Sequence, residues 1–148
     1  MILRRDGYSL SDDPAHLDRA LIHRWIHDDS YWAAGVPDDV QGRAIDNSLN
    51  FGVYEGDPGT HQVGYARVVT DLATFAWLCD VFVLEEHRGK GLAKWLVEAV
   101  VGHPELQGLR NMMLGTRDAH SLYERYGFER VEGSERYMRR FRPYRPAP

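Results

Sequence analysis

The sequence predicts a mixed α/β (α+β) protein in which helices flank a mostly antiparallel central sheet. The first observation is an apolar stretch at 75–84, whose aromatic and β-branched residues are typical of a strand buried on both faces. A polar, glycine-containing turn at 85–91 follows, and apolar residues then recur at helical spacing from Leu92 to Val100. The third observation is the apolar segment 109–114, which the crossover rule places parallel to the first strand.

The N-terminal third predicts one strand, at 8–10, and two helices. Asp13 followed by Pro14 indicates a helix start, because aspartate caps free amide groups and proline suits the first helical position. Pro37 marks the start of the second expected helix. An aromatic loop at 30–36 joins the two helices.

Further segments with strand character lie on either side of the central strand. Residues 51–54 and 62–69 are separated by a turn-rich connection, which predicts a hairpin and gives the central strand an antiparallel neighbour. After a short helix at 119–126, residues 128–131 and 137–141 are expected to pair as closing strands.

Composition and length predict a single domain at 1–141, followed by a proline-rich tail at 142–148 that is extended or disordered. Of the 148 residues, 43% are hydrophobic and 27% charged, which is a soluble globular balance. Cys79 is the only cysteine, so an internal disulfide is excluded and a cytoplasmic location is expected. A net charge of −4 argues mildly against nucleic acid as a partner and is compatible with an amine substrate, and no apolar run has membrane length.

The glycine-containing turn suits a phosphate, because a helix start offers free amide groups and the positive end of its dipole. Arg88 and Lys90 add two cations. A nucleotide-hydrolase P-loop would need GxxxxGK followed by serine or threonine, which the chain lacks. A dinucleotide fingerprint would need a third glycine after Gly89 and Gly91, where Lys94 stands.

The run Arg88-Gly89-Lys90-Gly91-Leu92-Ala93 resembles the Arg/Gln-x-x-Gly-x-Gly/Ala loop of the GCN5-related N-acetyltransferase (GNAT) superfamily. Asp80-Val81-Phe82-Val83 stands where that family has its acceptor-facing strand, and Ala119-x-x-Leu122-Tyr123-Glu124-Arg125-x-Gly127-Phe128 is similar to its second signature. The resemblance implies two splayed central strands and transfer of an acetyl group from acetyl-coenzyme A to a primary amine by direct attack in a ternary complex. It also allows a homodimer.

The resemblance implies two groups of coenzyme contacts. Backbone amides of the loop would hold the pyrophosphate, and the strand edge would pair with the pantetheine arm. Thr116 stands where the family often has an asparagine that contacts the coenzyme, and could instead cap the last helix. The expected coenzyme-binding residues are Val81, Phe82, Val83, Arg88, Gly89, Lys90, Gly91, Leu92, Ala93 and Thr116.

The catalytic pair implied by the resemblance is Tyr123, as the acid that protonates the departing thiolate, and Asp80, as the group that serves the amine. A phenol suits the first role because it stays protonated at neutral pH. The alternatives are a core tyrosine and an aspartate held by backbone or by an arginine. The expected acceptor-binding residues are Tyr31, Trp32, Trp77 and His120.

Two other interpretations remain beside this one. The rival function is a coenzyme A-binding module without catalysis, acting as a sensor or interaction domain; a nucleotide-binding protein is weaker, because no second phosphate or magnesium motif is present. His23 and His27 have helical i, i+4 spacing that can bind a metal, but the glutamate of zinc proteases is replaced by Arg24, so no metal is expected.

Overall fold

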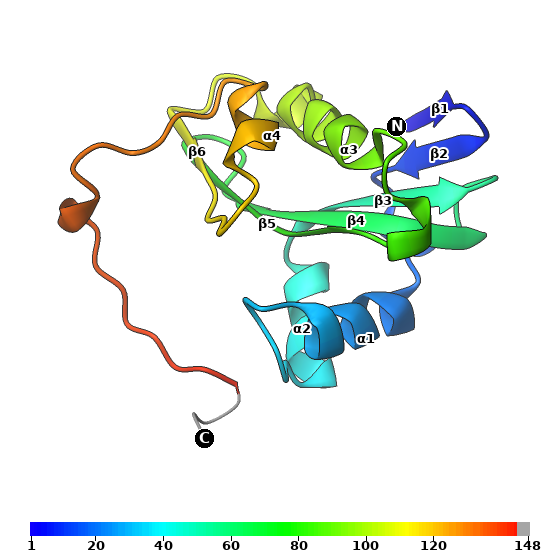
Figure 1. The fold of residues 1–148 in the computed structure, drawn as a ribbon, viewed down its shortest axis with the longest axis horizontal. Helices are drawn as coiled ribbons and strands as arrows, with labels where there is room; N and C mark the ends of the chain where they lie inside the picture. The colour runs from blue at the N-terminus through cyan, green and yellow to red at the C-terminus, as the bar shows by residue number, and fades with distance from the viewer. Residues whose placement is uncertain (145–148) are drawn as a thin grey trace.

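The computed structural model describes residues 1–144 and contains a six-stranded sheet with helices on both faces (Figure 1). The strands lie across the sheet in chain order: β1 (Ile2–Arg5), β2 (Tyr8–Ser11), β3 (Leu49–Glu55), β4 (His61–Thr70), β5 (Phe75–Val83) and β6 (Asn111–Met113). Each neighbouring pair is antiparallel except β5 and β6, which are parallel. The predicted mixed, mostly antiparallel sheet is therefore confirmed.

The two faces of the sheet are covered by different helices (Figure 1). The helices are α1 (Arg19–Asp29), α2 (Asp38–Asp46), α3 (Leu92–Val101) and α4 (His120–Glu124). α3 and α4 cover one face, and the buried side chains of α3 pack there against a large cluster that includes Leu10, Phe51 and Val63. α1 and α2 cover the other face around a smaller cluster that includes Tyr65 and Phe82.

The first helix begins later than predicted. Asp13 does act as a cap and Pro14 does follow it, but they start only a one-turn 3₁₀ helix, Pro14–His16. Leu17 is extended and ends that turn, and the side chain of Asp18 then caps α1. The cap signal was real, but it cannot reveal how far a helix continues.

The predicted closing strands at 128–131 and 137–141 are wrong, because neither segment is a strand in the structure. The chain leaves α4 and runs away from the sheet as an extended arm (Figure 1, orange to red). Strand-like side chains cannot form a strand without a neighbour to pair with, and an isolated hairpin is marginal in water. We call residues 128–144 the C-terminal arm. The last four residues of the predicted tail, 145–148, lie outside the described part of the chain.

β5 is less buried than its apolar sequence predicts. Phe75 and Trp77 are 40% and 37% exposed, whereas Ala76 and Leu78 between them are buried. The first half of β5 therefore alternates like a half-covered strand. Trp77 faces a cavity instead of a helix, and that cavity is the candidate active site.

Candidate active site

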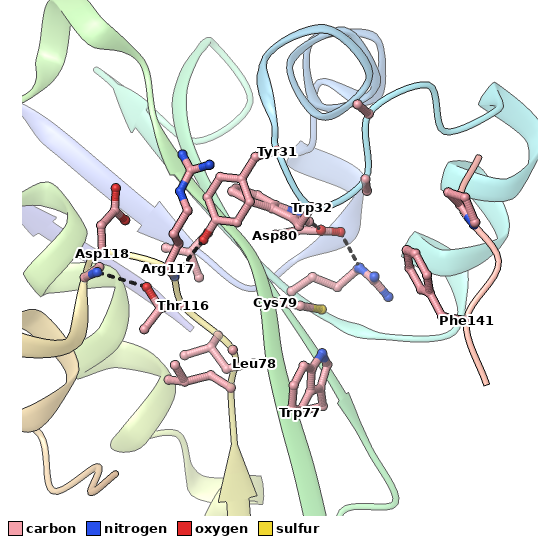
Figure 2. A pocket seen from close by; sticks show the side chains of 18 of the residues that line it. Tyr31, Trp32, Trp77, Leu78, Cys79, Asp80, Thr116, Arg117, Asp118 and Phe141 are labelled. Atoms are coloured by element: carbon pink, nitrogen blue, oxygen red, sulfur yellow. Dashed lines mark hydrogen bonds and ion pairs between the residues drawn. The ribbon is translucent and has the colours of Figure 1, made fainter. Parts of the chain in front are cut away.

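The site begins where the two parallel strands separate. β5 and β6 pair only along Phe75–Trp77 and Asn111–Met113. Beyond these residues the strands separate, and a cavity of about 1050 Å³ opens between them. Its walls are formed by 77–81 of β5, 114–119 after β6, 31–34 after α1, and 140–144 of the C-terminal arm, together with Arg67 and Tyr123 (Figure 2).

A bulge in β5 turns the side chain of Asp80 into this cavity. The register between β4 and β5 shifts between Tyr65 and Arg67, so that two residues of β5 oppose one of β4. Asp80 adopts a positive φ of 54° there, a conformation that aspartate tolerates better than most residues. Strained backbone of this kind is common at functional sites.

Asp80 is almost fully buried and is held by two donors. Its Oδ1 accepts a hydrogen bond from Trp32 Nε1, and its Oδ2 accepts one from Arg67 Nε, both at 2.8 Å (Figure 2). Burial disfavours the charge on Arg67, but the Asp80 carboxylate outweighs this and raises the pKa of Arg67. The contacts of Asp80 therefore match the alternative in which an arginine holds this aspartate. The role of Asp80 in the reaction stays a prediction.

Cys79 also lines the cavity, next to Asp80. Burial raises the pKa of its thiol to about 12, and the charge of Asp80 adds to this. The thiol therefore stays protonated at neutral pH. Because the thiolate is the nucleophilic form of cysteine, Cys79 is a poor nucleophile here.

Tyr123 projects from α4 toward the same cavity. Its side chain is 8% exposed, and its ring contacts Phe128 edge-on at 5.9 Å between centroids. Burial raises the pKa of its hydroxyl to about 12, with a smaller contribution from Tyr31. The phenol is therefore protonated across the neutral range, as the predicted acid requires, although its catalytic role stays a prediction.

The predicted acceptor residues divide between two cavities. Tyr31, Trp32 and Trp77 line the cavity of Asp80, with Tyr31 and Trp32 in edge-on contact at 5.0 Å. His120 lines a neighbouring hollow between β6, α4 and the C-terminal arm. The structure therefore brings three of the four candidates together.

The glycine-containing loop lies at the start of α3, as predicted. Gly91 is the residue before the helix, and both it and Gly89 have φ near 79°, which favours glycine. The two cationic side chains of the loop, Arg88 and Lys90, form hydrogen bonds to other residues of the chain. Arg88 Nε donates to the carbonyl of Val83 at 3.0 Å, and Lys90 Nζ donates to the hydroxyl of Tyr8 at 3.2 Å.

The other residues predicted to bind the coenzyme lie at the start of α3 and after β6, and that role stays a prediction. Leu92, the first residue of α3, is buried in the large cluster, and Ala93 packs at the edge of the same cluster. Thr116 lines the cavity, and its hydroxyl accepts a hydrogen bond from the Ala119 amide at 3.0 Å. It therefore stabilises the turn before α4, whereas Ala119 itself occupies the capping position.

Candidate metal ligands lie away from this cavity. His23 Nε2 contacts the carbonyl of Val36 at 2.8 Å, and His23 Nδ1 lies 3.5 Å from Asp38 Oδ1. Among the described residues, one cluster does have metal-binding spacing: a carboxylate oxygen of Glu55 and ring nitrogens of His61 and His87 lie within 4.8 Å of one another. It sits at the far end of the β3–β4 hairpin from Asp80.

Sequence reasoning missed three contributors to the cavity. Arg67 could have been suspected, because an arginine inside an apolar strand needs a buried partner. Arg117 and the C-terminal arm gave no usable signal, since their place depends on how the chain leaves β6 and α4.

The comparisons with known proteins agree with this geometry. The family model described as acetyltransferase (GNAT) domain matches residues 47–130. A Gibberella zeae protein named as an acetyltransferase, FG08082, is 35% identical over 139 residues, covering 80% of this chain and 77% of that protein.

Solved structures give the same result. A GNAT-family protein from Xanthomonas campestris is 48% identical and superposes with a TM-score of 0.87 over 95% of this chain and 97% of that one. Glucosamine-6-phosphate N-acetyltransferase from Arabidopsis thaliana shares the fold, with a TM-score of 0.63 at 18% identity over 92% of this chain and 99% of that one. No helix within residues 1–144 is both long and apolar enough to cross a membrane.

A family model that spans more than half of the chain, a close relative and the splayed parallel strands lead to one assignment. This chain belongs to the GNAT family and is an N-acetyltransferase.

Proposed function

We propose that the protein transfers an acetyl group from acetyl-coenzyme A to a primary amine by direct attack in a ternary complex. The observation that carries this proposal is the separation of β5 from β6 after Trp77 and Met113. It leaves a backbone edge open beside a cavity that Tyr123 lines. An extended pantetheine arm can add to such an edge as another strand, held by backbone groups of Val81 to Val83.

The loop at the start of α3 fits the phosphate end of the coenzyme. A Cβ built on Gly91 would have no atom within 4 Å, so the space in front of the loop is open. The first amide groups of α3 point there without intrahelical partners. Arg88, which donates to Val83, fixes the end of β5 against this loop. When bound, the coenzyme supplies the thioester whose carbonyl carbon the amine attacks.

The residues around the cavity have separate tasks in this proposal. Tyr123 donates its hydroxyl proton toward the departing sulfur, since burial keeps it protonated. Asp80 receives the amine proton, directly or through water, because each of its oxygens accepts one hydrogen bond and retains another lone pair. Trp32 and Arg67 hold Asp80 in position.

Direct attack is favoured over a covalent acetyl-enzyme by the state of Cys79. This thiol is the one sulfhydryl of the chain, and burial raises its pKa to about 12. An acetylated cysteine intermediate would need the thiolate, which this environment disfavours.

The test is thiol release from acetyl-coenzyme A in the presence of a panel of primary amines, with product mass confirmed for each. We expect amine-dependent release of coenzyme A and a rise in the melting temperature with acetyl-coenzyme A that ATP does not match. Equal stabilisation by ATP would contradict the coenzyme assignment. Stabilisation by acetyl-coenzyme A without any turnover would favour the rival, a non-catalytic coenzyme A-binding module.

A further inference from the structure

We infer that the acceptor is an amine that also carries an anionic group, a carboxylate or a phosphate, and that arginines of the cavity bind this group. The inference rests on the proposed acetyl transfer and extends it to the class of acceptor. The net charge of the chain was compatible with an amine substrate, and the inference adds an anionic group to that amine.

The charge of the cavity is opposite to that of the chain. The whole sequence has a net charge of −4. The cavity is lined by four arginines, Arg67, Arg117, Arg140 and Arg142, and by two aspartates, Asp80 and Asp118. Its local field therefore favours an anion, although the protein as a whole does not.

The Arg67–Asp80 pair makes no net contribution to that field. The two side chains are 17% and 6% exposed and lie 2.8 Å apart, so the charge of Asp80 is compensated before any substrate enters. An acceptor ammonium would meet a neutral pair here. Outside this pair, three arginines face one carboxylate, that of Asp118.

Arg117 is fixed on the cavity wall. Its guanidinium carbon lies 4.0 Å from the centroid of the Tyr31 ring, and its backbone amide donates to the Tyr31 hydroxyl at 3.0 Å (Figure 2). A stacked guanidinium keeps its in-plane N–H donors, which match the geometry of a carboxylate or phosphate. Within residues 1–144, no carboxylate forms an ion pair with Arg117.

The C-terminal arm contributes the other two arginines. Arg140 and Arg142 flank Phe141, and all three line the cavity. Figure 2 shows Phe141 across the cavity from Asp80. The ion pairs of the described residues include neither arginine. The C-terminal arm, which is not part of the sheet, thus adds positive charge and an aromatic side chain to the cavity where the acceptor would bind.

This arrangement also favours the reaction. Acyl transfer needs the neutral amine, and nearby positive charge lowers the pKa of an ammonium group. Binding the anionic end at the arginines leaves the amine end directed away from them, toward Asp80 and the strand edge. A polyamine, which has no anionic end, would be repelled by the same arginines.

The experiment compares matched ligands on the protein saturated with coenzyme A, so that no turnover occurs. O-phosphoethanolamine and ethanolamine differ only in the phosphate, and spermidine represents a polycation. We expect calorimetric titration to show binding at least about tenfold tighter for O-phosphoethanolamine than for ethanolamine, the effect of one charge-assisted hydrogen-bonded contact, and the weakest binding for spermidine.

Three variants locate the contact. Arg117→Gln and the double variant Arg140→Gln/Arg142→Gln should each remove most of the preference for the phosphate. Arg24→Gln, an exposed arginine on α1 outside the cavity, is the matched control and should retain it. Coenzyme A affinity is measured first for each variant. An arginine that contacted the coenzyme would change this affinity, whereas an arginine that contacts the acceptor would change only the preference for the phosphate.

Equal affinity for the two ethanolamines, tighter binding of spermidine, no detectable binding of O-phosphoethanolamine, or equal losses in Arg24→Gln and Arg117→Gln would each overturn the inference. Failure of coenzyme A itself to bind would count against the proposed function. In that case the same titrations on the free protein still decide whether the cavity prefers an anion.

Discussion

The two sides of the β5–β6 separation are packed very differently. On the side of β2, β3 and β4, side chains such as Leu10, Phe51 and Val63 have no exposed surface at all. On the other side, Tyr123 is the one buried residue after Leu106 in the described chain. The first region holds the hydrophobic core, and the second forms one wall of a cavity.

The two regions should therefore contribute to different properties, the first to folding stability and the second to the reaction. Burial of apolar surface is the main favourable term in folding, so the region of β2 to β5 and α3 should carry most of the free energy of unfolding. The region after β6 contributes Tyr123, Arg117 and the C-terminal arm to the cavity, and few of its side chains are buried. Substitutions in the two regions should therefore have opposite profiles.

The largest expected effect is on catalysis, for Tyr123→Phe. Loss of a positioned acid lowers the rate roughly 10²–10⁴-fold, which is about 3 to 5 kcal/mol of transition-state stabilisation. Folding should be nearly unchanged, since the ring remains and no residue within 1–144 hydrogen-bonds to the hydroxyl. The measurement is kcat with a working amine, together with the melting temperature.

Coenzyme affinity is the control for this variant and should match that of the parent. A kcat within about threefold of the parent would remove Tyr123 from the acid role, because it lies far below the general-acid range. Water or another group would then have to protonate the sulfur.

Leu96→Ala should show the reverse profile. Leu96 is fully buried in α3, and truncating such a leucine typically costs about 2 to 5 kcal/mol of stability. Urea unfolding measures the loss, and Leu3→Ala, at 38% exposure on β1, is the matched control with an expected change of about 0.5 kcal/mol or less. If Leu96→Ala loses no more stability than the control, the hydrophobic core does not lie around Leu96.

Gly91→Val tests the boundary between the two regions. A branched residue at a φ of 79° is strained by roughly 1–2 kcal/mol, so the loop should move and coenzyme A affinity should fall about tenfold or more. Gly108→Val is the matched control, because Gly108 has a φ of 78° and equally open surroundings away from the loop. Calorimetry should show weaker binding for Gly91→Val alone, and equal binding by both variants would place the pyrophosphate elsewhere.

Most of the sheet could be predicted because its signals are local or follow from chain order. The apolar run at 75–84 and the helical stripe from Leu92 gave the strand, loop and helix, and the connection lengths gave the antiparallel and parallel neighbours. The closing strands failed because 128–131 and 137–141 have strand composition but no partner. Partner availability is a property of the whole fold, which composition does not contain.

The site was predictable to the extent that motifs specify it. Tyr123, Asp80 and the loop at 88–93 were identified from short patterns, and the structure places the first two on one cavity. Motifs could not show that Arg67 compensates Asp80, because that contact depends on the register of two strands. They also could not show that residues near the C-terminus line the same cavity.

The smallest expected effect is on the C-terminal arm, for Met138→Ser. Met138 is 95% exposed, and substitutions at such positions usually change stability by less than about 0.5 kcal/mol. Urea unfolding of the parent, Met138→Ser and Leu96→Ala under the same conditions gives the comparison directly. A loss for Met138→Ser that approaches the value for Leu96→Ala would mean that the arm is buried in solution, against its own β6 edge or against a second copy of the chain. Dependence of that loss on protein concentration would separate the two cases, because only association with a second copy makes stability depend on concentration.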